Sequence, residues 1–141
     1  MKHYISLLLT VIISALSLSS CDKMDCNDGL DGQWQMIEWT SATGELVGDK
    51  HMRLYYCFQL QMMTFQMDGG WQPSSFENNG SSIRVYDPIS YAGNGQDNIL
   101  DMGVLSKYGV PNDGIMKVET LTSNRLVLSS KQYGTLTFRK F

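Results

Sequence analysis

The stretch from Arg53 to Met67, which reads RLYYCFQLQMMTFQM, constrains the fold more tightly than any other part of the chain. Apolar side chains occupy the even positions from Leu54 to Met62 and then the odd positions from Met63 to Met67. A period of two is typical of a β-strand with one buried face, and a shift of one residue exchanges its two faces. We therefore expect one long strand that a β-bulge bends at Met62-Met63, as in a closed or strongly curved sheet. The alternatives are two strands joined by a tight turn, or a strand buried on both faces.

Further short apolar runs follow the same period of two, and residues that favour turns separate them. Asn78-Asn79-Gly80 is a strong hairpin signal, while Pro73 places its strand at a sheet edge or a kink. Seven or eight short strands joined by tight turns predict an all-β antiparallel meander, hence a barrel or a sandwich. Beyond the central stretch, we expect strands at Gln33 to Trp39, Trp71 to Phe76, Ile83 to Tyr86, Met116 to Leu121, Arg125 to Ser130 and Thr135 to Phe141.

The segment from Tyr91 to Asp113 interrupts this rhythm with several glycines and a proline. Within it we expect one short helix, at Ile99 to Tyr108. Long loops inside compact domains are often functional, so the segment is either a lid over an open end of a barrel or a plain connector.

The beginning of the chain predicts an exported protein. After Lys2 and His3, residues 4–18 are almost wholly apolar, a run that suits a signal peptide and is short for a membrane span of about 20 residues. Leu18-Ser19-Ser20-Cys21 then resembles the lipobox of bacterial lipoproteins. That resemblance implies cleavage before Cys21 and acyl chains on its thiol and amine, which would hold the protein on a membrane. An ordinary secretory signal with a chance cysteine is the alternative.

These features divide the chain into three parts: a lipoprotein signal peptide at 1–20, an acidic tether at 21–29 and a folded domain at 30–141. Cleavage would leave 121 residues with 10 basic and 14 acidic side chains. This negative balance argues against a nucleic-acid partner, which requires a basic face.

We expect a lipid-anchored protein in the cell envelope of a Gram-negative bacterium, at the outer membrane. Its expected partner is that membrane, which it contacts through the acyl chains on Cys21.

Two short motifs at the ends of the domain carry a resemblance to a known family. Gly32-Gln33-Trp34 opens the first strand, and Arg139-Lys140 lies near the end of the last. They resemble the framework of lipocalins and of small lipocalin-like lipoproteins of Gram-negative gut bacteria. The resemblance implies a closed lipocalin-like barrel of about seven or eight strands, in which Trp34 fills the closed end and a cation packs on its ring. In the last strand, Lys140 falls on the same face as Leu136 and Phe138, and Arg139 falls on the opposite face. The resemblance requires only a basic residue near the end of this strand, so both are candidates for that cation.

Few residues in the mature chain are suited to catalysis or metal binding. His51 is the only histidine left after cleavage, and it lies in a polar turn. No Gly-x-Ser-x-Gly elbow and no zinc-type spacing of cysteine and histidine is present. We expect no enzyme activity, no cofactor and no metal. Cys26 and Cys57 are expected to be free thiols, although an exported protein permits a disulfide.

The strands carry soft and aromatic side chains on their apolar faces. Methionine adapts to irregular shapes, so such an interior either packs as a plain core or accepts a small apolar ligand. We expect a non-catalytic domain that binds such a ligand inside the barrel; the alternative is an accessory module that docks on another envelope protein. An enclosed cavity above about 300 Å³ favours the first, and a filled barrel with an exposed apolar patch favours the second. The candidate ligand-lining residues are Met36, Tyr56, Phe58, Met62, Met63, Phe65 and Met116.

Overall fold

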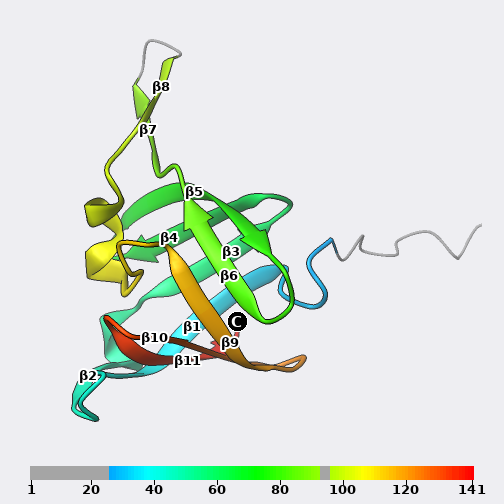
Figure 1. Cartoon of the computed structure of the whole chain (residues 1–141), viewed down its shortest axis with the longest axis vertical. Coiled ribbons are helices and arrows are strands. Elements are labelled where there is room, and N and C mark those ends of the chain that lie inside the picture. Colours follow the sequence, from blue (N-terminus) through cyan, green and yellow to red (C-terminus); the bar gives the residue numbers. More distant parts are fainter. Residues whose placement is uncertain (1–25, 93–95) are drawn as a thin grey trace, which may run out of the picture.

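The computed structural model describes residues 26–92 and 96–141, and most of its regular segments are β-strands (Figure 1). Two short 3-10 helices, η1 (Lys50–Met52) and η2 (Met102–Tyr108), interrupt the strands. The strands are β1 (Gly32–Thr40), β2 (Leu46–Asp49), β3 (Tyr55–Gln59), β4 (Met62–Met67), β5 (Gly70–Asn78), β6 (Ser82–Tyr86), β7 (Ile89–Ala92), β8 (Gln96–Ile99), β9 (Ile115–Leu121), β10 (Arg125–Ser130) and β11 (Gly134–Lys140).

Eight of these strands close into an antiparallel barrel. The hydrogen-bonded order is β11-β10-β9-β6-β5-β4-β3-β1, and β11 pairs back onto β1 to complete the ring. The first half of β1 pairs with β3, while its second half pairs with the extra strand β2. Closure removes the unpaired edges that an open sheet would expose to other chains. The closed all-β barrel confirms the fold expected from the sequence.

The expected β-bulge at Met62-Met63 is wrong, and the tight turn is right. The stretch forms a hairpin in which β3 and β4 are joined at Leu60-Gln61, with Gln59 paired to Met62. Opposite residues of a hairpin point to the same face. Because the turn has two residues, even-numbered Phe58 faces odd-numbered Met63, and the inward positions change parity without any bulge.

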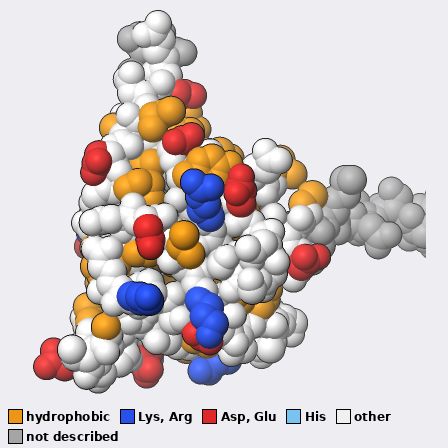
Figure 2. All heavy atoms as spheres, viewed as in Figure 1, with side chains coloured by type: hydrophobic (Ala, Val, Ile, Leu, Met, Phe, Trp, Pro, Cys, Tyr) orange, Lys and Arg blue, Asp and Glu red, His pale blue; other side chains and the backbone are white. Residues whose placement is uncertain are grey.

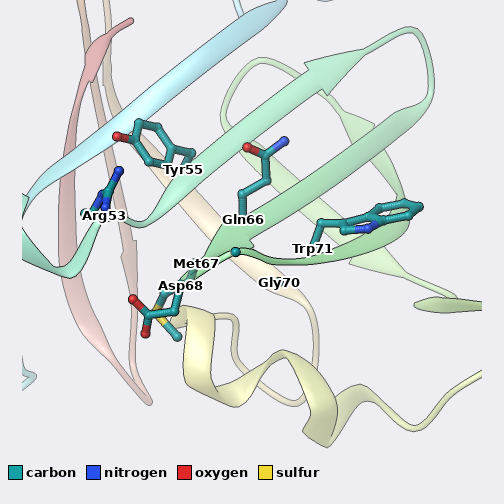
Figure 3. A pocket seen from close by; sticks show the side chains of 8 residues that line it. Arg53, Tyr55, Gln66, Met67, Asp68, Gly70 and Trp71 are labelled. Atoms are coloured by element: carbon teal, nitrogen blue, oxygen red, sulfur yellow. The ribbon is translucent and has the colours of Figure 1, made fainter.

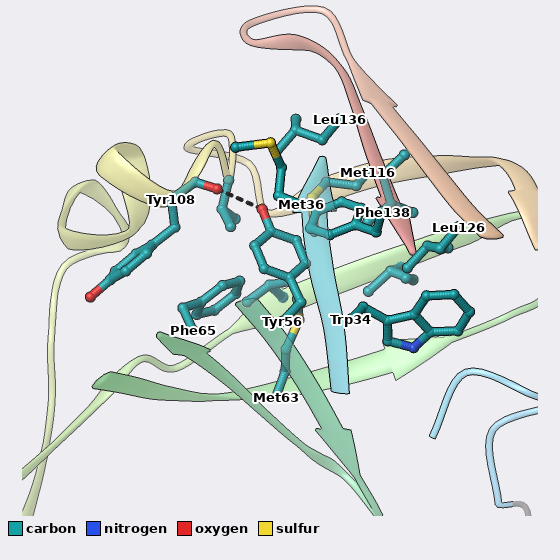
Figure 4. Packing of buried hydrophobic residues seen from close by; sticks show 14 of the residues in the cluster. Trp34, Met36, Tyr56, Met63, Phe65, Tyr108, Met116, Leu126, Leu136 and Phe138 are labelled. Carbon is teal, nitrogen blue, oxygen red and sulfur yellow. Dashed lines mark hydrogen bonds between the residues drawn. The ribbon is translucent and has the colours of Figure 1, made fainter. Parts of the chain in front are cut away.

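The barrel is filled by one continuous core. Side chains from all eight barrel strands and from η2 contribute buried residues to it (Figure 4). Aromatic rings dominate the centre, where the Tyr56 ring lies 4.9 Å from that of Phe65 and 4.5 Å from that of Phe138. The largest fully buried side chains include Trp34, Tyr56, Tyr108, Phe58, Phe65 and Phe138.

The segment between β6 and β9 differs from the expected loop. β7 and β8 form a separate two-stranded ribbon, which projects from the barrel in Figure 1. The side-chain amide of Gln72 on β5 donates to the Ile89 carbonyl at 2.9 Å and ties the ribbon to the barrel. The expected helix is present as η2, which starts at Met102 rather than Ile99. It buries Leu105 and Tyr108 against the core.

The antiparallel order gives the barrel two different ends. The Trp34 end is where the chain enters at Leu30, and it also holds the 60–61 and 79–81 turns and the C-terminal residue Phe141. The η2 end holds the 68–69 turn and, of the segment between β6 and β9, residues 87–92 and 96–114, which include η2. In the residues that the structure describes, no helix is long and apolar enough to cross a membrane.

Candidate functional site

Trp34 closes one end of the barrel. Its side chain is fully buried, and its indole N–H donates to the Leu30 carbonyl at 2.7 Å. The Lys140 ammonium lies 4.4 Å from the centre of the ring and also donates to the Asp31 carbonyl. A cation held over an indole face is attracted by the negative potential of the ring. This cluster fixes the entering chain to the last strand.

Lys140, and not Arg139, is the cation on Trp34. Trp34 and Lys140 are directly opposite in the β1–β11 ladder, so their side chains share the inner face. Arg139 points outward, where its guanidinium donates two hydrogen bonds to Gln35 Oε1 at 2.9 and 2.7 Å.

Gly32 leaves room for Lys140 at this end. It has a φ of +115°, and a Cβ at this position would lie 3.0 Å from Lys140 Cε and Nζ. A side chain at residue 32 would therefore push Lys140 off the indole.

The chain just before the barrel is hydrogen bonded to the Trp34 end. The Asn27 side chain donates to the Leu60 carbonyl at 2.9 Å, and the Asn78 side chain donates to the Asn27 carbonyl at 3.2 Å. The backbone N–H of Cys26 donates to the Asp31 carboxylate at 2.9 Å. Residues 26–29, which the sequence assigned to the acidic tether, are therefore held on the barrel by Cys26 and Asn27. The lipidation candidate Cys21 lies outside the described residues.

Six of the seven candidate ligand-lining residues lie in the packed interior. Side chains around an empty chamber large enough for water would keep accessible surface, but these are covered by one another. Their exposed fractions are 0% for Met36, Tyr56, Met63 and Phe65, 1% for Met116 and 2% for Phe58. The seventh, Met62, is half-buried and borders a hollow on the outside of the barrel. In this conformation the barrel is filled by its own side chains.

η2 covers the other end of the barrel. The Tyr56 hydroxyl donates to the Tyr108 carbonyl at 2.6 Å (Figure 4), and the Tyr108 ring stacks on Phe65 with centres 5.4 Å apart. Burial raises the pKa of Tyr56 far above its ordinary value because the phenolate would be desolvated. Tyr56 is therefore a neutral hydrogen-bond donor that joins the barrel wall to η2. The sequence placed Tyr108 on a short helix but gave no sign of this bond.

A hollow of about 410 Å³ opens on the outer wall near the η2 end. Tyr55, Gln66 and Trp71 are opposite one another on β3, β4 and β5, and Figure 3 shows them in this row. Trp71 is 59% exposed, and its ring packs at a tilt of 34° against that of Tyr91 of the ribbon, with centres 5.7 Å apart. An exposed aromatic pair of this kind is typical of a recognition surface. Sequence patterning had assigned Trp71 only to a strand.

A second and larger hollow, of about 950 Å³, lies at the Trp34 end. Its wall combines Cys26 and Asn27 of the entering chain with Leu60 and Met62 of the β3–β4 hairpin and with Phe76 of β5. It is open to solvent, as is the first hollow. Both recesses therefore lie on the outside of a filled barrel.

His51, Cys26 and Cys57 make local contacts near the surface of the described part of the chain. His51 is exposed, and its backbone N–H and ring both bond the Asp49 carboxylate, which lowers the pKa of Asp49. Cys26 and Cys57 are free thiols, and burial raises the pKa of Cys57. Within residues 26–92 and 96–141, no three histidine, cysteine or acidic side chains are grouped to hold a metal ion.

Comparison with known proteins agrees with this architecture. A lipocalin-like protein from Bacteroides uniformis ATCC 8492 superposes with a TM-score of 0.57 at 25% identity, covering 80% of this chain and 99% of that one. An uncharacterized protein from Bacteroides eggerthii DSM 20697 gives 0.54 at 21% identity, covering 79% and 98%. A search of curated proteins found no match. The family model described as "Lipocalin-like domain" matches residues 16–141, and the chain therefore belongs to the lipocalin-like domain family.

Proposed function

We propose that this protein is a lipid-anchored, non-catalytic binding module of the bacterial cell envelope, held at the outer membrane by acyl chains on Cys21. Its barrel serves as a rigid body that presents the η2 end to another envelope protein. The lipobox-like sequence before Cys21 supports the anchor, and the filled interior supports recognition through the outer surface.

The positions of the exposed apolar side chains favour binding through the outer surface over binding inside the barrel. The interior leaves no free apolar wall, whereas Trp71, Tyr91 and Ile99 are 59%, 56% and 68% exposed at the η2 end. Figure 2 shows apolar side chains gathered toward the part of the molecule from which the β7–β8 ribbon projects. Exposed aromatic residues on a supported strand and ribbon are suited to anchor a protein partner.

A second candidate function is the binding of a small apolar ligand inside the barrel. The flexible side chains of Met36, Met63 and Met116 favour it, since methionine repacks readily around varied shapes. This function requires η2 to swing away and the Tyr56–Tyr108 hydrogen bond to break. It predicts a bound small molecule in protein taken from its native membrane.

Native mass spectrometry of the acylated protein, purified from its own envelope after cross-linking, separates the two candidates. The module hypothesis predicts a co-purifying protein that is lost in Trp71→Ala and kept in Leu46→Ala, a change at a similarly exposed residue of β2, which lies on the side of the molecule away from the β7–β8 ribbon (Figure 1). A stoichiometric small-molecule adduct with no partner protein would instead support the ligand carrier.

The anchor has a separate test. Cells fed labelled palmitate should label the wild-type chain and leave Cys21→Ala unlabelled, and the variant precursor should remain uncut. Equal labelling of the Cys21→Ala chain would show that another residue carries the lipid.

A further inference from the structure

Leu60 at the tip of the β3–β4 hairpin combines two unfavourable properties. Its side chain is 64% exposed, although it is large and apolar. Its φ is 55°, in the left-handed region where a residue with a Cβ is strained and where glycine or asparagine is usual. The two-residue turn requires a positive φ at its first residue, so the unusual feature is that leucine, and not glycine or asparagine, stands there. The neighbouring tips at the Trp34 end are polar: Asn79-Gly80-Ser81 and Thr122-Ser123-Asn124.

The hairpin tip is also tied to the chain that leads to Cys21. The Asn27 side chain donates to the Leu60 carbonyl at 2.9 Å, and the Asn27 carbonyl accepts from Asn78 at 3.2 Å. Asn27 is six residues from Cys21. Six extended residues span at most about 20 Å, so an acylated Cys21 would keep Leu60 close to the bilayer surface.

The chemistry around Leu60 suits a lipid surface. The turn Gln59-Leu60-Gln61-Met62 contains no charged side chain that would lose its hydration on contact with lipid. Half-buried Met62 lies beside Leu60 on the wall of the hollow, next to the polar Gln61 and Asn78. Phe141, a further exposed apolar side chain at this end, instead lies against the outer wall, where the centres of its ring and the Tyr55 ring are 5.4 Å apart.

We propose that the Leu60 side chain inserts into the interfacial region of the membrane and so docks the Trp34 end of the barrel on the bilayer. This inference rests on the proposed anchor at Cys21, because the tether supplies the high local concentration that makes one leucine sufficient. Docking directs the η2 end, with Trp71 and the β7–β8 ribbon, away from the membrane. The protein then has a fixed orientation and does not swing freely on its tether.

Fluorescence quenching tests the contact directly. The acylated protein, which begins at Cys21, is placed in phosphatidylcholine vesicles with brominated acyl chains, and vesicle flotation reports the anchor independently. Leu60→Trp should be quenched strongly, while Leu46→Trp, at an equally exposed site of the η2 end, should not. Native tryptophan emission should stay unquenched, since Trp34 and Trp39 are buried and Trp71 lies at the η2 end.

A second variant separates membrane contact from folding. Leu60→Asn should raise the melting temperature by about 3 °C, because asparagine tolerates the left-handed backbone better than leucine does. On vesicles, the same change should lower the hydrogen-exchange protection of residues 59–62 about tenfold, because it removes the apolar contact. If Leu60 had a purely structural role, Leu60→Asn would change the melting temperature and the hydrogen-exchange protection of residues 59–62 in the same direction.

The outcomes are distinct. Flotation with quenching confined to Leu60→Trp supports the inference. Flotation in which Leu60→Trp is quenched no more than Leu46→Trp overturns the inference and leaves the anchor intact. Failure of the protein to float overturns the proposed anchor, and the docking of Leu60 is then wrong with it.

Discussion

At the scale of single residues, the closed end shows what a strand pattern can and cannot decide. Alternation places Lys140 on the same face as Phe138 and places Arg139 on the opposite face, which is how the structure has them. Alternation does not show that Arg139 is held by Gln35 across the β1–β11 ladder. That contact lies between residues far apart in the chain, so only the barrel's closure creates it.

Lys140→Ala should destabilise the protein more than Arg139→Ala. The first change removes the cation over Trp34 and the hydrogen bond to the Asp31 carbonyl, together worth about 1.5 to 3 kcal/mol. The second removes two part-buried hydrogen bonds to Gln35, whose side chain is only 8% exposed, and should cost about 1 kcal/mol. Urea unfolding of the two variants measures the difference, and equal losses would contradict the role assigned to Lys140.

Tyr56→Phe should lower the free energy of unfolding by about 1 kcal/mol at neutral pH, because the bond to the Tyr108 carbonyl is lost. Its raised pKa adds a pH dependence: only the unfolded chain ionises Tyr56, so the stability from this residue is complete below pH about 10 and is lost above it. Wild type should therefore lose about 1.4 kcal/mol more per pH unit above that value than Tyr56→Phe does. Parallel alkaline unfolding curves would refute this.

At the scale of elements, the sequence predicted the strands that bury one face in the core. It missed strands that bury neither face. Apolar and polar residues alternate clearly along the strands of the barrel because one face of each strand packs in the core. β7 and β8 pair exposed or half-buried residues such as Ser90 and Asn98, so no apolar period marks them. The β3–β4 turn was mistaken for a bulge because Leu60-Gln61 lacks the glycine or asparagine that usually identifies a turn.

Gly134 and Gly80 allow a matched test of the β10–β11 turn. Both have a positive φ, 78° and 87°. A Cβ at Gly134 would lie 2.2 Å from the Thr40 carbonyl oxygen, whereas at Gly80 nothing lies within 4 Å. Gly80→Ala should cost about 1 kcal/mol for backbone strain alone. Gly134→Ala should cost at least about 3 kcal/mol, because β1 and β11 must separate to admit the methyl group. Thermal unfolding of both variants measures this, and similar melting temperatures would rule out a tight β1–β11 closure at this turn.

At the scale of the whole molecule, the barrel separates two roles between its ends. The entering chain, Trp34 and the Leu60 tip lie at one end, while η2, Trp71 and the ribbon lie at the other. The sequence predicted the closed barrel and six of the seven residues proposed to line its interior, with Met62 the exception. It did not distinguish a chamber from a core, because alternation gives the direction of a side chain but not whether its volume fills the space in front of it. The filled interior is therefore a finding of the structure, and it is the central claim of this account.

Methyl-13C NMR of the methionines tests that claim most directly, since Met36, Met63 and Met116 lie in the interior and Met62 and Met67 lie nearer the surface. The acylated protein in nanodiscs is titrated with dodecanoate as an apolar probe. We predict that the three interior methyl signals keep their positions and widths throughout the titration, whatever the outer methyl signals do. Saturable shifts of all three interior signals would show that the barrel opens to hold a ligand, and would contradict the account.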